Sequence, residues 1–175
     1  MFQFVFPSET FATDAQTTDS AASAFAIYSG VKTNHYTMGY DSSVIKGNAT
    51  HNATAYDTIY KWAQVRTVQS CTCNRSHFNS YHMHKTQDAG KDTGFVTTTR
   101  LSHATPAALY AQTPHRDWEC DSKTPKEFYR KDISHQLIHT SPGNKSKVML
   151  GGGIRSFIPE SKKEQYFPTN KKNLK

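Results

Sequence analysis

The sequence contains no run of about 18 apolar residues, and this absence excludes a transmembrane helix. Only 35% of the 175 residues are apolar, and the mean hydropathy is −0.71. A chain of this length can form one domain, but the core that it could bury alone is thin. The opening residues MFQFVF are too few, and lack the basic region, for a signal peptide. The composition therefore predicts a piece of a globular protein rather than a complete one.

Acidic residues are scarce in two parts of the chain. Residues 65–87 contain three Lys or Arg and no Asp or Glu, and the last 21 residues contain six against two. The net charge of +7 is therefore unevenly distributed. The chain has no interleaved aromatic and basic motif and no zinc-finger spacing, so we expect no nucleic-acid partner. We interpret residues 169–175 as a frayed, solvated basic tail, with a polyanion-binding arm as the alternative.

A small nucleophile directly after an acid is the most informative feature that the chain does have. Asp19 is a good helix N-cap, and Ser20 would begin a helix that Gly30 ends. The apolar residues of this stretch recur at helical spacing: Ala21, Ala24, Phe25 and Tyr28. The first turn of a helix favours both an alkoxide and a bound phosphate. An Asp-Ser pair is otherwise only a capped helix start.

The rest of the chain alternates between helix and strand patterns. We expect a helix at 57–64 with Ile59, Tyr60 and Ala63 on one face, a buried strand at 93–99 and a helix at 132–138. A helix should also begin at Pro106 with Thr105 as its cap, and a short strand at 147–150 should run into three glycines. This alternation predicts an α/β fold with a mostly parallel sheet layered with helices.

Three blocks of the chain resemble the alkaline phosphatase family in order and separation. They are 17–34 (TTDSAASAFAIYSGVKTN), 96–118 (VTTTRLSHATPAALYAQTPHRDW) and 148–155 (VMLGGGIR). The resemblance covers most of 7–64 and 88–168, and we interpret 1–168 as a partial, incomplete alkaline phosphatase domain. The family's domain is more than twice as long as this chain.

The resemblance implies hydrolysis of phosphate monoesters through a phosphoserine intermediate, with two Zn²⁺ ions and one Mg²⁺ ion. Ser20 would be the zinc-held nucleophile, Arg116 the phosphate-binding arginine and Asp19 the acid that orients it. Thr105 would bind magnesium directly and His103 through water. We expect these side chains to converge in one cleft, with Arg116 at the far end of the helix that begins at Pro106. Without the family, Arg116 would be a surface ion-pair residue and Thr105 a helix cap.

The family also implies partners and a location. They are phosphate monoester substrates, a second copy in a homodimer, and secretion or the cell surface, with a membrane contact only through a C-terminal lipid anchor lost from this chain. Three glycosylation triplets begin at Asn48, Asn52 and Asn144. The family's other metal ligands lie outside the part that this chain matches. Activity of this chain alone is therefore in doubt, since one hydroxyl cannot retain zinc.

Residues 65–87 interrupt the family pattern, and their removal restores the join WAQDAGK. Val65-Arg66 can be encoded by a run that begins GTAAGA and Gln87 by CAG, so we hypothesise a retained, in-frame intron that is disordered in the protein. An ordinary disordered insertion is one alternative. A zinc site is another, with donors Cys71, Cys73, His77, His82 and His84.

The remaining cysteine, Cys120, has no obvious partner. The resemblance implies a disulfide whose two positions hold Gly47 and Arg130 here, so we expect it to be missing. Two other functions stay open beside the phosphatase: a non-enzymatic phosphate-binding or interaction protein, and a different phosphate- or sulfate-ester hydrolase of the same superfamily.

Overall fold

The computed structural model describes residues 11–48, 53–64, 91–128, 132–159 and 161–162. The insertion 65–87 with its proposed zinc donors, the tail 169–175 and Arg130 lie outside these ranges, so the predictions made for them stay predictions. Cys120 is buried and free within the described part of the chain.

Local signals in the sequence define the first helix, α1 (Ser20–Ser29), as predicted. The carboxylate of Asp19 accepts hydrogen bonds from the N–H groups of Ala21 (3.0 Å) and Ala22 (3.2 Å), which otherwise have no partner in the first turn. Gly30 ends the helix with φ +75°, a left-handed conformation that glycine adopts without steric cost. The face that α1 buries is formed by Ala21, Ala22, Ala24 and Phe25.

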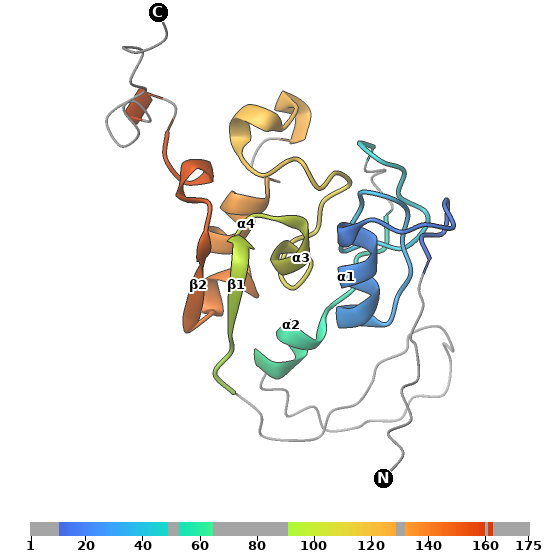
Figure 1. Ribbon diagram of the computed structural model, residues 1–175, viewed down its shortest axis with the longest axis horizontal. Coiled ribbons are helices and arrows are strands. Elements are labelled where there is room, and N and C mark those ends of the chain that lie inside the picture. Colours follow the sequence, from blue (N-terminus) through green and yellow to red (C-terminus); the bar gives the residue numbers. More distant parts are fainter. Residues whose placement is uncertain (1–10, 49–52, 65–90, 129–131, 160, 163–175) are drawn as a thin grey trace, which may run out of the picture.

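Two parallel strands form the sheet, β1 (Gly94–Arg100) and β2 (Val148–Gly152) (Figure 1). Their register pairs Phe95 with Met149 and Val96 with Leu150, and it shifts before Arg100. The predicted parallel sheet is confirmed for this pair, and so is the strand that runs into the glycines. A Cβ atom at Gly151 would lie 2.8 Å from side-chain carbons of both Leu101 and Thr97, so a larger residue at this point of β2 would require these side chains to shift.

The strand predicted at 93–99 is present, but the prediction that it is buried is wrong. Along β1, half-buried and exposed residues alternate, and Val96 is 73% exposed. Phe95 and Met149 pack against the core from one face of the sheet. The side chains of Val96 and Leu150 lie on the other face and are exposed to solvent. A strand of a parallel sheet is usually covered on both faces, but the described residues cover only one face of β1.

The shorter helices agree with the sequence in part. In α2 (Ile59–Gln64) only Tyr60 is buried. The sequence predicts that Ile59 shares one helix face with Tyr60, but Ile59 is 56% exposed, so this prediction is wrong for Ile59. By contrast, α4 (Ile133–His139) begins after Asp132, which accepts from the N–H of His135 at 2.9 Å, and this helix is confirmed. Single 3₁₀ turns lie at Asp121–Lys123, Lys126–Phe128, Gly143–Lys145 and Ile154–Ser156.

The helix expected to begin at Pro106 begins two residues earlier, as α3 (Ala104–Ala107). His103 is its N-cap, so the assignment of Thr105 as the cap is wrong. Proline is tolerated at the third position because the N–H groups of a first turn have no partner within the helix. Proline therefore marks the first turn here without marking its first residue.

The core lies where α1, α3 and α4 meet the inner face of the sheet. Figure 1 shows α3 between β1 and α1. The buried cluster consists of Ala21, Ala24, Phe25, Met38, Ala104, Ala107, Ala108, Tyr110, Ala111, Ile133 and Leu137. Six of these are alanines, which lets the helices approach closely. In the described ranges, no helix combines the length and apolarity that crossing a membrane would require.

Candidate active site

Ser20 lies at the N-terminus of α1, as the first helical residue after the Asp19 cap. Its side chain is half-buried, and its hydroxyl lies beside the guanidinium of Arg116. The serine therefore occupies the helix end at which the helix dipole favours negative charge.

Arg116 reaches this helix end from a turn that follows α3 by several residues. Its Nη1 donates to Ser20 Oγ at 2.5 Å and to Asp19 Oδ2 at 3.0 Å. The expectation that Arg116 ends a helix begun at Pro106 is wrong, because α3 stops at Ala107. The turn is held instead by the main chain, where Arg116 N–H donates to the carbonyl of Tyr36 at 2.8 Å.

The pKa of Asp19 is lowered. Burial alone would raise the pKa of this carboxyl, but the N–H groups of Ala21, Ala22 and Tyr36 and the Arg116 side chain stabilise its charged form and outweigh that effect. The side chains of this ion pair are only 10% exposed for Asp19 and 18% for Arg116. Asp19 is thus an ionised group that caps α1 and orients the arginine at once.

His103 and Thr105 approach from the carboxyl end of β1, where sites of α/β sheets gather. Burial, and then the positive charges of Arg116 and Arg100, lower the pKa of His103 and favour neutral imidazole. Its Nε2 lies 3.2 Å from Arg116 Nη2 and can accept a hydrogen bond there. Thr105 Oγ1 is exposed and lies 3.4 Å from His103 Nδ1. The structure thus brings together all five residues that the sequence singled out.

Two further parts of this region were missed by sequence reasoning. Tyr36 contacts both Asp19 and Arg116 through its main chain, and its backbone conformation leaves no signal in a single sequence. Behind His103, buried Glu119 accepts from Arg100 Nε (3.0 Å) and Nη2 (2.7 Å). An acid next to Trp118 in the motif HRDWE could have been noted, but nothing in its spacing indicates Arg100 as its partner.

The residues of this region do not by themselves fit a complete zinc or magnesium centre. A zinc ion takes about four donors, usually thiolates, imidazoles or carboxylates. In the described part of the chain no group of three or more such side chains is placed to hold a metal ion. Ser20 and Thr105 offer two hydroxyl oxygens, so further ligands would have to come from outside the described residues.

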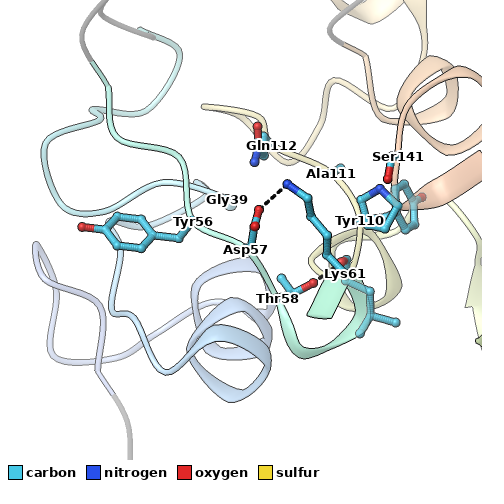
Figure 2. Close-up of a pocket in the computed structure, with 11 residues that line it drawn as sticks. Gly39, Tyr56, Asp57, Thr58, Lys61, Tyr110, Ala111, Gln112 and Ser141 are labelled. Atoms are coloured by element: carbon cyan, nitrogen blue, oxygen red, sulfur yellow. Dashed lines mark hydrogen bonds and ion pairs between the residues drawn. The ribbon is translucent and has the colours of Figure 1, made fainter. Parts of the chain in front are cut away.

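A separate pocket lies between α2 and the segment after α3 (Figure 2). Lys61 extends across it and pairs with Asp57, their Nζ and Oδ1 atoms 2.5 Å apart. None of the five residues grouped around Arg116 lines this pocket. The pocket therefore plays no part in the candidate active site.

Helices layered on a parallel sheet define the α/β class of protein, and an arginine beside a serine at a helix N-terminus is an arrangement that favours an anion. Residues 1–174 match the family model of alkaline phosphatase. The chain belongs to the alkaline phosphatase family, and the identification from its sequence motifs is confirmed.

Individual relatives agree with this assignment. The chain is 38% identical over 149 residues to alkaline phosphatase 4 of Drosophila melanogaster, covering 84% of this chain and 21% of the relative. It is 34% identical over 175 residues to the tissue-nonspecific alkaline phosphatase of Homo sapiens, covering 98% and 29%. The chain therefore spans less than a third of the length of these relatives.

Solved structures confirm the α/β fold. The cold-active alkaline phosphatase of a psychrophilic Shewanella species matches with a TM-score of 0.53 at 24% identity, over 90% of this chain and 28% of that one. A mutant of the TAB5 alkaline phosphatase with Mg bound matches with a TM-score of 0.51 at 20% identity, over 85% and 29%. The sheet and helices described above thus form an incomplete alkaline-phosphatase-like fold.

Proposed function

We propose that this chain supplies the nucleophile and the phosphate-binding arginine for hydrolysis of phosphate monoesters. One observation carries the proposal: Arg116 Nη1 donates to both Ser20 Oγ and the Asp19 carboxylate. An arginine fixed by an acid at the position of a helix N-terminal hydroxyl can hold two phosphate oxygens while the hydroxyl oxygen faces phosphorus. Membership of the alkaline phosphatase family supports the same reaction.

In the proposed reaction Ser20 Oγ attacks phosphorus, and the bond from phosphorus to the alcohol oxygen breaks. The alcohol leaves with a proton, and water then hydrolyses the phosphoserine to release inorganic phosphate. Arg116 and the N-terminus of α1 stabilise the negative charge on the phosphate oxygens in both steps. The Asp19 carboxylate keeps the Arg116 guanidinium aimed at the phosphate. The neutral His103 imidazole accepts a hydrogen bond from the other terminal nitrogen of Arg116, Nη2.

Metal ions belong to this proposal as cofactors, which would take further ligands from outside the described residues. Two Zn²⁺ ions and one Mg²⁺ ion would activate the Ser20 hydroxyl and hold phosphate, with Thr105 as a direct ligand and His103 acting through water. We also propose a homodimer at the cell surface or outside the cell, from family membership alone.

Substitution of Ser20 tests the proposal in the full-length protein loaded with zinc and magnesium. Incubation with a ³²P-labelled phosphate monoester, followed by an acid quench, should trap label on the unmodified protein and none on Ser20→Ala. Arg116→Ala should weaken binding of inorganic phosphate by about tenfold to a hundredfold, the scale of hydrogen bonds to charged groups. Ser29→Ala, at the other end of α1, should leave both measurements unchanged and serves as the control.

The outcomes separate the two main functions. Labelling and turnover that persist in Ser20→Ala would contradict the assignment of the nucleophile. Phosphate binding that depends on Arg116, in a protein that never turns over a monoester, would favour a non-enzymatic phosphate-binding role instead.

A further inference from the structure

Tyr36 has an unusual backbone conformation beside the candidate active site. Its φ is +66°, and in the described residues no other residue except glycine has a positive φ. Side chains with a Cβ atom rarely adopt this left-handed region, and a bulky side chain there is a genuine outlier. Such a conformation persists only where the surroundings hold it, and strained residues of this kind cluster at functional sites.

The main chain of Tyr36 contacts both halves of the candidate site. Its N–H donates to Asp19 Oδ1 at 3.2 Å, and its carbonyl accepts from Arg116 N–H at 2.8 Å. The left-handed conformation sets the directions in which these two groups point. One residue thereby joins the cap of α1 to the turn that carries Arg116, two segments 97 residues apart in the sequence.

The ring of Tyr36 is held by neighbours from two other loops. Lys46 Nζ lies 3.7 Å from the ring centroid, and the His115 ring lies at a centroid distance of 5.8 Å. The Arg116 guanidinium carbon is 6.0 Å from the same ring. A cation and an aromatic ring at these distances both attract the tyrosine ring. The contacts offset the cost of the left-handed backbone.

We propose that Tyr36 is a positioning residue for Arg116: its left-handed backbone links Asp19 to Arg116, and the contacts of its ring with Lys46 and His115 hold that backbone in place. This inference rests on the proposed function, because it assigns to Arg116 the binding of phosphate. It predicts that the backbone conformation at residue 36, and not the phenol group itself, sets the affinity of the site for phosphate.

Two substitutions that both remove the ring separate the backbone from the side chain. In Tyr36→Ala the Cβ atom still disfavours the left-handed region and the ring contacts that hold it are gone, so the backbone should relax and both main-chain hydrogen bonds should weaken. In Tyr36→Gly the ring is also gone, but the left-handed conformation carries no steric cost. Tyr36→Pro removes the N–H and fixes φ near −65°.

The dissociation constant of inorganic phosphate, measured by titration calorimetry on the full-length zinc- and magnesium-loaded protein, should discriminate these variants. We expect Tyr36→Gly to bind within about threefold of the unmodified protein, Tyr36→Ala about tenfold more weakly, and Tyr36→Pro more weakly still. Thermal unfolding of each variant accompanies the titration. A merely structural role would lower the melting temperature and leave the phosphate affinity of the folded protein unchanged.

Equal affinities for Tyr36→Ala and Tyr36→Gly would overturn the proposal, whether both match the unmodified protein or both are weakened. If Tyr36→Pro does not fold, the comparison of alanine with glycine still decides the matter. An unmodified protein that binds phosphate but hydrolyses no monoester would contradict the proposed enzymatic function and leave the positioning role standing. An unmodified protein that binds no phosphate would overturn both.

Discussion

At the scale of single residues, Asp19 performs two tasks whose energies can be separated. Its carboxylate caps α1 through two backbone N–H groups, and it also forms the ion pair with Arg116. Asparagine is nearly as good a cap as aspartate, whereas it cannot form an ion pair. The cost of replacing Asp19 with asparagine therefore measures the ion pair with Arg116 together with the hydrogen bond from the Tyr36 N–H, rather than the cap alone.

We expect Asp19→Asn to lower the free energy of unfolding at neutral pH by about 1.5–3 kcal/mol, the range for hydrogen bonds to charged groups. Asp132 supplies the matched control, because it caps α4 through the N–H of His135. Asp132→Asn should cost only a few tenths of a kcal/mol. Urea unfolding of both variants measures the difference, and equal losses would show that the ion pair contributes nothing.

Residues near Ser20 were predictable from local pattern, and those far from it were not. Asp19 and Gly30 carry the cap signals of α1, so the position of Ser20 follows from its neighbours in sequence. No spacing rule connects Arg116 to Ser20 across 96 residues, and only the family resemblance indicated their approach. The positive φ of Tyr36 is decided by its partners in space, which a single sequence does not contain.

At the scale of elements, Glu119 ties the end of β1 to the start of α4. Its carboxylate accepts from Arg100 and Ser102, and its main-chain carbonyl accepts from the N–H of Ser134. Burial alone would raise the pKa of Glu119, but the hydrogen bonds from Arg100 and Ser102 outweigh it and lower the pKa below its ordinary value. The connection between the two elements therefore depends on an ionised carboxylate.

A group whose pKa is lowered on folding stabilises the folded state above its unfolded-state pKa, here near 4.5, and loses that contribution as the pH falls through the folded value. We expect Glu119→Gln to lower stability by about 1–3 kcal/mol at pH 7, toward the lower end because half of Arg100 is exposed. The difference from the unmodified protein should shrink below pH 4.5. Chemical denaturation between pH 3 and 7 measures it, with Glu127→Gln, at an exposed position, as the control. A pH-independent difference would assign the effect to packing.

The bounds of α1 and α4 followed local signals, whereas the first residue of α3 and the burial of the elements did not. α4 begins after Asp132 as its cap pattern indicates, whereas α3 begins at Ala104 because His103, which carries no typical cap signal, ends the turn from β1. The alternation along β1 depends on what covers each face of the sheet. That covering comes from distant segments, so the sequence of residues 93–99 indicated a strand but not its exposure.

At the scale of the whole molecule, the exposed outer face of the sheet predicts that residues 1–175 associate in solution as their concentration rises. Val96 and Leu150 are register partners, exposed by 73% and 58%, so together they form one contiguous apolar surface. Two molecules that meet through such surfaces remove them from water, which favours association.

In sedimentation velocity runs, the apparent mass of this polypeptide should rise with concentration. Replacing both residues by threonine, which keeps the preference for strand, should weaken this rise, whereas Thr98→Ser on an exposed position of β1 should not. An apparent mass that stays constant over a hundredfold range of concentration would show that the molecules do not associate through this face. The polypeptide could then be concentrated for crystallisation.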